Sequence, residues 1–435
     1  MLEAMHRFPL PCLLLLLSAC GAPAAPVAPL PLALALAPAA HAVTDWPLPL
    51  IASAAQPDLV RTADGRLLLS WIEIAGQGHA LKFATFADKT WSAPREIARG
   101  EDWFVNWADT PHVLATEDGA LWAQWLRQSA SATYAYDVVL SRSGDGGTTW
   151  SRAVTVNSDG TPTEHGFVSV WPQSRQTVGI AWLDGRNTGG GGHGGHDGHG
   201  AGVMALRMAN FDAALNKSAE TELDPRTCDC CQTGAAMTTR GPLLVYRDRD
   251  GEEIRDIVST RRENGAWTLP RKVHDDRWKM PACPVNGPAL VAQANDAWVA
   301  WYTAAGDVPK VRVAHSPNAG DRFSAPVALD SGMAVQGRVG IALEAGEVWV
   351  NWTREDANGQ SLWLTRHSAD LGKELQRVRV ATLQGRGRAT GFPQMAVRDG
   401  IGYVVWTDVV NGKPVLRGAR LAANDDAGGT VPVGN

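Results

Sequence analysis

The stretch Leu67-Leu68-Leu69-Ser70-Trp71 is an apolar run that ends in an aromatic residue, and runs of this kind recur along the whole chain. The six later copies are Leu121–Trp125, Val178–Trp182, Leu243–Tyr246, Ala297–Trp301, Val348–Trp352 and Tyr403–Trp406. Their terminal aromatic residues are spaced by 54, 57, 64, 55, 51 and 54 positions. Such a period predicts a repeat architecture in which each unit packs against its neighbours.

Every copy has the same order of elements. An apolar strand such as Pro57–Val60 comes first, and a polar turn follows it, often with the pair Asp-Gly, as in Asp64-Gly65. The aromatic-ended strand comes next, then a third strand such as Lys82–Thr85, a further turn and a fourth strand. Four short strands at this period describe one blade of a β-propeller. The sequence therefore predicts an all-β propeller of four-stranded blades; we count seven blades, with six as the alternative.

The last copy shows only three strands before the C-terminal tail. The segment Thr44–Ser53 precedes the first copy and is strand-like. We therefore expect an N-terminal strand from this segment to complete the last blade and to close the ring.

A turn motif links this chain to a known group of propellers. Ser143-Gly144-Asp145-Gly146-Gly147-Thr148-Thr149-Trp150 resembles, at every position, the Asp box of the sialidase-like (BNR/Asp-box) β-propeller superfamily, and Ser316–Phe323 is a weaker echo. A short carboxylate can accept backbone N–H bonds across such a turn, and glycine tolerates positive φ there. The resemblance implies a structural role, away from the active face, for Ser143, Asp145, Gly147 and Trp150.

Composition excludes several classes of protein. With 45% hydrophobic and 20% charged residues, the chain of 435 residues is neither disordered nor a polytopic membrane protein. Lys and Arg number 40 against 45 Asp and Glu, which gives a net charge of −5. Without a basic surplus to neutralise phosphates, nucleic acid is excluded as an expected partner. We expect a monomer.

The N-terminal residues predict export. A basic start and a short apolar run over residues 1–19 are typical of a signal peptide. Leu17-Ser18-Ala19-Cys20 resembles the lipobox of bacterial lipoproteins, which implies lipidation of Cys20 and anchoring in a membrane of the cell envelope. Gly21 after the cysteine favours the outer membrane, facing the periplasm. The alternative is a secretory signal cleaved near Ala40 or His41.

These signals divide the chain into four segments. The signal peptide covers residues 1–19, and a Pro/Ala-rich tether covers 20–43. The propeller covers 44–421, and we expect residues 422–435 to be a disordered tail.

A glycine-rich loop in the third repeat carries His193, His196 and His199 within seven residues. Glycine between the histidines allows their imidazoles to converge on one ion, so the loop is a candidate metal site. The alternative is a flexible surface insertion.

Four cysteines lie in the connections that enter the fourth and fifth repeats: Cys228, Cys230, Cys231 and Cys283. In an oxidising envelope they are disulfide candidates, with Cys283 joined to one of the other three. The alternative is a soft-metal site for copper(I) or zinc built from their thiolates. The two states could alternate with redox conditions.

Four further residues on the same rim are candidates for ligand binding. Glu164 and His165 enter the third repeat, Arg338 enters the sixth, and Arg388 enters the seventh. Arginines that point at a central depression would suit a carboxylate ligand. The alternative is ordinary solvated charge.

The resemblance also sets out what a sialidase needs. That family binds the sugar carboxylate with three arginines and uses a tyrosine nucleophile paired with a glutamate. Here Ala55 occupies the position of the first arginine, Arg338 and Arg388 could replace the later two, and the sequence assigns no Tyr–Glu pair.

We therefore predict a lipid-anchored envelope protein whose propeller binds a small-molecule, glycan or metal ligand on its Cys/His-rich rim, without competent sialidase activity. The alternatives are an exo-alpha-sialidase-type glycoside hydrolase and a copper- or redox-handling envelope protein. Whether the chain is an enzyme stays open at this point.

Overall fold

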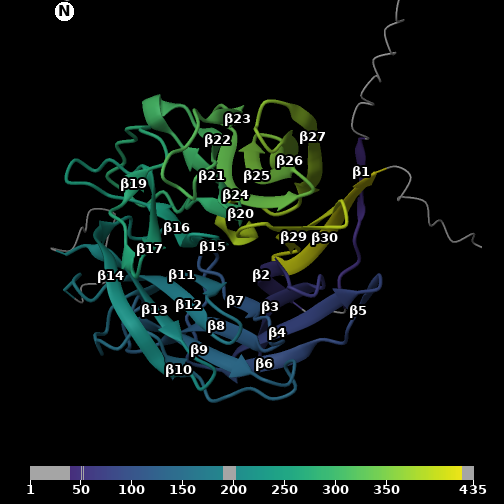
Figure 1. The fold of residues 1–435 in the computed structure, drawn as a ribbon. Helices are drawn as coiled ribbons and strands as arrows, with labels where there is room; N and C mark the ends of the chain where they lie inside the picture. Colours follow the sequence, from purple (N-terminus) through teal and green to yellow (C-terminus); the bar gives the residue numbers. More distant parts are fainter. Residues whose placement is uncertain (1–39, 50, 52, 190–201, 424–435) are drawn as a thin grey trace, which may run out of the picture. The chain divides into compact units, whose positions relative to one another are not determined.

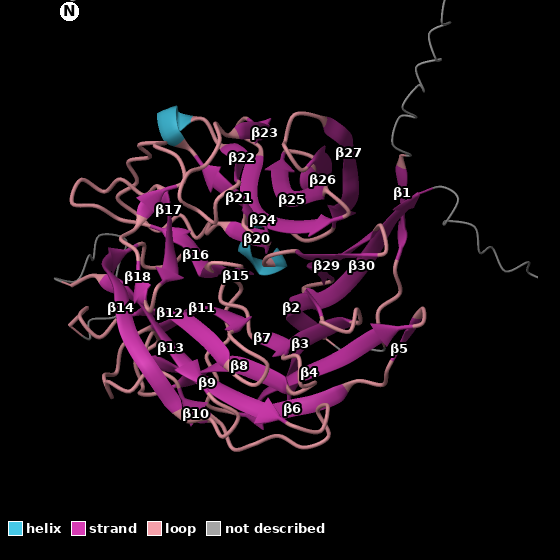
Figure 2. Cartoon of the chain, viewed as in Figure 1, coloured by secondary structure: helices cyan, strands magenta, loops and turns pink. Residues whose placement is uncertain are grey.

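The computed structural model describes residues 40–49, 51, 53–189 and 202–423, and these residues form seven antiparallel sheets arranged in a ring (Figure 1). Between the strands the described chain runs mainly through loops, with short 3₁₀ turns at Ala305–Asp307 and Gly387–Thr390 (Figure 2). The predicted all-β propeller and the count of seven blades are both confirmed. In each blade the first strand is the innermost.

The strands follow one another around the ring in chain order. The first blade contains β2 (Ala54–Arg61), β3 (Leu67–Ala75), β4 (Gly78–Ala87), β5 (Thr90–Trp91) and β6 (Arg95–Gly100). The second contains β7 (His112–Ala115), β8 (Leu121–Gln128), β9 (Tyr136–Ser143) and β10 (Val154–Thr155). The third contains β11 (His165–Pro172), β12 (Val178–Asp184), β13 (Met204–Phe211) and β14 (Lys217–Thr227).

The fourth blade contains β15 (Gly234–Thr238), β16 (Gly241–Arg247), β17 (Ile257–Glu263), β18 (Ala266–Trp267) and β19 (Arg271–Lys272). The fifth contains β20 (Ala289–Gln293), β21 (Asp296–Thr303), β22 (Lys310–Ser316) and β23 (Val327–Ser331). The sixth contains β24 (Val335–Glu344), β25 (Glu347–Asp356), β26 (Gly359–Ser368) and β27 (Glu374–Leu383). The seventh contains β28 (Gln394–Arg398), β29 (Ile401–Val410), β30 (Lys413–Ala423) and the N-terminal β1 (His41–Asp45).

The ring is closed by an N-terminal strand, as predicted. β1 pairs antiparallel with β30, from His41 opposite Ala423 to Asp45 opposite Ala419. The closing strand lies earlier than the expected segment, which began at Thr44. Pro47 and Pro49 have no N–H group to donate to a neighbouring strand, so the ladder continues only as far as the bond from Trp46 N to Gly418 O (3.0 Å).

Aromatic residues fill the spaces between blades. The repeat residues Trp71, Trp182, Trp301 and Trp352 are fully buried. They belong to hydrophobic clusters that combine strands of neighbouring sheets. Each blade therefore buries its faces against the next blade. The sequence repeats because every blade places an aromatic residue at the same packing position.

The Asp box forms the turn between β9 and β10. The Asp145 carboxylate accepts backbone N–H bonds from Thr148 (3.0 Å) and Thr149 (2.9 Å). Gly147 has φ +87°, and a Cβ at this position would lie 2.3 Å from Cζ of Phe83 in the first blade. Trp150 packs edge-on against the same ring at 6.2 Å. The motif thus fixes a turn and docks one blade on another.

The packing around Trp46 generates a test of ring closure. This side chain is 5% exposed, and its ring lies 4.6 Å from Tyr403, 4.9 Å from Trp91 and 5.1 Å from Phe86. Replacing it by alanine leaves a cavity beside the closing strand, so Trp46→Ala should lower the free energy of unfolding by about 3–5 kcal/mol, measured by urea denaturation. The exposed Leu269 (84%) supplies the control: Leu269→Ala should change it by less than about 0.5 kcal/mol. Equal effects of the two variants would contradict this account of closure.

Candidate functional site

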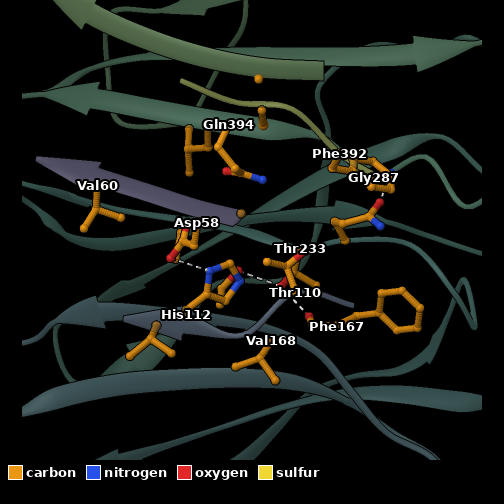
Figure 3. Close-up of a pocket in the computed structure, with 18 of the residues that line it drawn as sticks. Asp58, Val60, Thr110, His112, Phe167, Val168, Thr233, Gly287, Phe392 and Gln394 are labelled. Atoms are coloured by element: carbon orange, nitrogen blue, oxygen red, sulfur yellow. Dashed lines mark hydrogen bonds and ion pairs between the residues drawn. The ribbon is translucent and has the colours of Figure 1, made fainter. Parts of the chain in front are cut away.

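The seven innermost strands enclose a cavity of about 310 Å³ on the ring axis (Figure 3). One residue of each strand pairs with the residue that precedes the repeat aromatic, and we call these seven the cavity layer. They are Asp58, His112, Ser169, Gly234, Ala289, Gly340 and Gln394. Polar side chains come from the seventh, first, second and third blades, whereas the fourth to sixth blades contribute only glycine or alanine.

Asp58 and His112 form an ion pair in this layer. His112 Nδ1 lies 3.2 Å from Asp58 Oδ2, which also accepts the backbone N–H of Val113 at 3.3 Å. Burial by itself lowers the pKa of His112, but the charge and hydrogen bond of Asp58 outweigh it and raise that pKa above its usual value. The pair therefore places a buried carboxylate and a readily protonated imidazole on the cavity wall.

Asp109 is the second carboxylate of the cavity wall. Its side chain is 4% exposed, and Oδ2 accepts the backbone N–H of Phe167 at 2.7 Å. Oδ1 is buried and has no hydrogen-bond partner among the described residues. Burial, reinforced by the negative charge of Glu164, raises the pKa of Asp109 to about 7. Sequence reasoning noted Asp109 only as one of many loop acids.

The mouth of the cavity lies two residues nearer the start of each inner strand. The seven residues of this mouth layer are Gln56, Thr110, Phe167, Gln232, Gly287, Arg338 and Phe392. Gln56, Phe167 and Arg338 have positive φ angles of 47°, 51° and 54°, each within a β-bulge that redirects its side chain. Gln232 donates to Ala108 O at 2.7 Å and accepts from Gly287 N at 2.9 Å, so it joins the second, fourth and fifth blades.

Arg338, one of the predicted ligand-binding residues, is 6% exposed at this mouth. Its guanidinium donates to Thr390 Oγ1 (2.8 Å), Gly391 O (3.0 Å) and Gly387 O (2.9 Å), and it stacks on Trp107 at 5.0 Å. Burial lowers its pKa to about 10. These contacts use the guanidinium donors within the protein, which leaves few of them for a ligand.

Arg388, also predicted to bind ligand, lies on the exposed side of the same aromatic residue. Its guanidinium is 5.8 Å from the Trp107 ring, and Phe392 stacks on that ring at 5.8 Å. Both predicted arginines therefore pack against the Trp107 ring, whereas the sialidase resemblance implied arginines directed at a ligand carboxylate.

A Tyr–Glu pair that the sequence did not assign joins the second and third blades. Tyr136 Oη donates to Glu164 Oε1 at 2.7 Å, and the two residues form an isolated parallel bridge. Tyr136 is fully buried and Glu164 is 7% exposed. Burial and the charges of Glu164 and Asp109 raise the pKa of Tyr136 well above its usual value. The pairing depends on how two blades meet, which the spacing of the sequence does not reveal.

His165, the neighbour of Glu164, points into a different polar cluster. It is fully buried, and its Nε2 lies 3.2 Å from Asp159 Oδ1 and 3.9 Å from Asp184 Oδ1. Arg186 binds Asp184 through Nε (2.7 Å) and Nη2 (2.8 Å), and Trp182 Nε1 donates to the same carboxylate at 2.7 Å. Asp159, His165 and Asp184 are residue types that can bind a metal ion, but Arg186 already pairs with the Asp184 carboxylate. The cluster is a buried ion network between strands.

Three of the four candidate cysteines come together at the entry to the fourth blade. Cys228, Cys230 and Cys231 are buried free thiols whose Sγ atoms all lie within 4.8 Å of one another. The Sγ atoms of Cys228 and Cys231 are 2.9 Å apart. Cys283, from the connection into the fifth blade, is an exposed free thiol that interacts with the Cys230 side chain. We call these four residues the thiol cluster.

Two buried arginines face the thiol cluster. Arg255 Nη1 donates to Cys228 Sγ at 3.3 Å, and Arg247 is held by bonds to Asn286 O at 3.0 and 2.7 Å. Burial alone would raise the pKa of Cys228, but hydrogen bonds from the neighbouring thiols and the charges of Arg255 and Arg247 hold it well below its usual value. Burial and the interactions with the other thiols raise the pKa of Cys230. Of these thiols, Cys228 is thus the one whose surroundings most favour the charged form.

The remaining predicted residues lie outside the described part of the chain. His193, His196 and His199 fall in residues 190–201, and the lipidation candidate Cys20 falls in residues 1–39. Their roles stay predictions. In the described residues, no helix is long and apolar enough to cross a membrane.

No protein-family model and no curated protein matches this sequence. The polysaccharide lyase Uly1 has a similar structure, with a TM-score of 0.53 and 8% identity over 86% of this chain and 91% of the lyase. A mutant of the NanB sialidase from Streptococcus pneumoniae gives a TM-score of 0.45 and 9% identity, over 83% of this chain and 84% of that one. The endosialidase of phage phi92 gives 0.48 and 11%, over 91% and 71%.

The chain therefore has the β-propeller fold that the Asp box predicted, and it shares this fold with the lyase Uly1. At 8% identity the similarity to Uly1 shows the fold alone. What the chain does must be argued from its own residues.

The raised pKa of Asp109 predicts how stability depends on pH. Between about pH 4 and pH 7 the native protein holds this proton and the unfolded chain does not, so raising the pH through that window lowers the free energy of unfolding. Asp109→Asn removes this titration. We therefore compare the two proteins by subtracting the free energy of unfolding of Asp109→Asn from that of the wild type. This difference should fall by on the order of 3–4 kcal/mol between pH 4 and pH 8.

The measurement is urea denaturation of both proteins across this range. Asp399→Asn, which changes an exposed carboxylate (73%), should show no comparable change relative to the wild type. A constant difference between the wild type and Asp109→Asn at all pH values would contradict the raised pKa.

Proposed function

We propose that this chain binds a soft metal ion, copper(I) or zinc, through its thiol cluster, on the rim of a propeller anchored in the bacterial cell envelope. The observation that carries the proposal is the convergence of Cys228, Cys230 and Cys231, with Sγ atoms within 4.8 Å of one another, and the contact of Cys283 from the next blade. Cys228 and Cys283 are 55 residues apart, close to one repeat period, and the ring brings their connections together.

The spacing of the sulfur atoms suits a common ion. Zinc–thiolate bonds are about 2.3 Å long, so sulfur ligands in a tetrahedral site lie about 3.8 Å apart. Thiolate ligands select copper(I), zinc and iron–sulfur clusters over harder cations. Small rotations about the cysteine side-chain bonds would bring the sulfur atoms from their present separations to that distance.

The surroundings also suit a charged thiolate site. Three or four thiolates around one such ion carry a net negative charge, and a buried charge is costly unless it is paired. Arg255 reaches Cys228, and Arg249 and Arg255 are themselves held by Asp229 and Glu253 through contacts of 3.0 and 2.9 Å. The fixed cations would compensate the thiolates without competing for the metal.

Disulfide bonding is the competing state of the same residues. Cys228 and Cys231 need to approach from 2.9 Å to about 2.0 Å to form an S–S bond, and Cys230 could bond to Cys283. Both states fit an envelope protein, and the proposal assigns metal binding to the reduced state.

The anchoring part of the proposal rests on sequence alone. Leu17-Ser18-Ala19-Cys20 and the following Gly21 support a lipid anchor at Cys20 in the outer membrane, with the propeller in the periplasm. Residues 20–43 would then act as the tether between the lipid and the ring.

Metal analysis of the full chain purified under reducing conditions tests the metal site. By elemental mass spectrometry we expect about one copper or zinc ion per chain. The Cys230→Ser/Cys231→Ser variant should lose most of this metal content. The matched variant His193→Ala/His196→Ala/His199→Ala leaves the thiols intact and should retain the ion. Circular dichroism shows whether each variant is folded.

Three outcomes would overturn the metal proposal. The first is reduced, folded protein that takes up neither copper(I) nor zinc from a competing chelator. The second is undiminished metal content in the double cysteine variant. The third is peptide mapping that finds all four cysteines in disulfides that resist mild reduction.

A sialidase-type hydrolase is the second candidate function, and the hydrogen bond between Tyr136 and Glu164 favours it. The remainder of the site argues against it. Tyr136 is fully buried, Arg338 donates to protein acceptors, and Trp107 stacks on both Phe392 and the Arg338 guanidinium. A glycan carboxylate would find no open arginine triad there.

We therefore expect no hydrolysis of a fluorogenic sialoside by the purified chain. Hydrolysis that Tyr136→Phe abolishes, and that Tyr134→Phe leaves unchanged, would favour the second candidate. Tyr134 is the matched control because it lies two residues earlier and is partly exposed.

A further inference from the structure

The axial cavity has a polar wall and an apolar wall. Gln394, Asp58, His112 and Ser169 come from four adjacent blades and therefore lie on one side of the cavity layer. Glycine and alanine in the cavity layer of the other three blades leave the space open, and Leu290, Val339 and Ile341 line that side, with Thr233 as a polar residue at its edge. A volume of about 310 Å³ is at the lower end of the range for small-ligand pockets, so it suits a ligand of monosaccharide size.

The charge of the cavity wall is acidic. Its titratable residues are Asp58, Asp109 and His112, and among the described residues that line it none is lysine or arginine. His112 compensates Asp58 directly at 3.2 Å. Asp109 makes no hydrogen bond to a cation of the described residues, and among those cations only His112 acts on it through its charge, from a distance. With a pKa of about 7 it is partly charged at neutral pH, and a bound cation would favour its charged form.

Asp109 also presents an unsatisfied acceptor. Its Oδ1 is buried without a hydrogen-bond partner among the described residues, while the side chain is 4% exposed. A buried polar atom without a partner costs free energy, and a donor on a bound ligand would remove that cost. Gln394 makes no side-chain hydrogen bond to another described residue, and its amide offers a further donor and acceptor on the same wall (Figure 3).

We propose that the axial cavity binds a small organic cation, of monosaccharide size or less, whose ammonium group pairs with Asp109 and whose other polar groups contact the cavity layer. The acidic wall excludes carboxylate-bearing ligands such as uronic or sialic acids from this cavity, since no arginine or lysine would receive them. The apolar wall would take the hydrocarbon face of the ligand. This site is separate from the thiol cluster and does not depend on it.

Three sugars that differ only at C6 test the charge preference. The probes are 6-amino-6-deoxyglucose, glucose and glucuronate, titrated into the full chain at neutral pH and followed by calorimetry or ligand-observed NMR. We expect the amino sugar to bind at least about tenfold more tightly than glucose, because a charge-assisted hydrogen bond is added, and we expect no binding of glucuronate.

Two variants assign the effect to the cavity. Asp109→Asn keeps the shape of the side chain and should remove the preference for the amino sugar, whereas Asp399→Asn on the exposed surface should leave it unchanged. If Asp109→Asn does not fold, Gln394→Ala supplies the second variant and should weaken the binding of the amino sugar.

Each of four results would overturn the proposal. They are no binding of the amino sugar, equal binding of glucose, stronger binding of glucuronate, and no effect of the cavity variant, which means an unchanged preference in Asp109→Asn or, if that variant does not fold, unchanged affinity for the amino sugar in Gln394→Ala. In each case the cavity would be a solvent-filled channel or a site of different chemistry.

Discussion

The pairing of β1 with β30 is the constraint on which the rest of the structure depends. A ring of seven sheets has no free end only when its last blade is completed, and here five residues from the N-terminal side of the chain complete it. Closure fixes the inner strands around one axis. Asp58 and His112, 54 residues apart, then meet as an ion pair, and Gln232 reaches Ala108 over a separation of 124 residues. The second contact joins blades that are not neighbours, so it needs the curvature of the ring.

The fold could be predicted because its signals are local and repeated. An apolar run that ends in Trp71 marks the second strand of a blade, and the same pattern returns six times because each blade solves the same packing problem. The Asp box was equally predictable, since Asp145 and Gly147 act within one turn. The start of β1 was not, because the choice of His41–Asp45 depends on which residues can donate to β30, and the two prolines that follow decide it.

The site was predictable only where spacing carries the information. The residues of the cavity layer lie 12 or 13 positions before the repeat aromatic, as with Asp58 before Trp71 and Gln394 before Trp406, so the polar wall of the cavity could have been found from the alignment of repeats. The gathering of the cysteines followed from the same logic. The Tyr136–Glu164 pair did not, since it depends on how the second and third blades meet. The burial of Arg338 did not either, since it depends on a bulge that rotates this side chain out of the regular alternation.

The two candidate binding regions differ in the sign of the charge that the protein supplies. Around the thiol cluster, Arg255 and Arg247 are placed against sulfur, which compensates thiolates that would otherwise be buried without a cation. Around the axial cavity, Asp109 is placed where no arginine or lysine of the described residues reaches it. Gln232 follows Cys231 directly and also forms part of the cavity mouth, so the two regions share a wall although their electrostatics are opposite. Burying each charge costs free energy, and neither arrangement improves the packing of the blades. A ring stabilised by its tryptophans does not need these charges, and this is the physical reason to assign the cluster and the cavity to ligands of different chemistry.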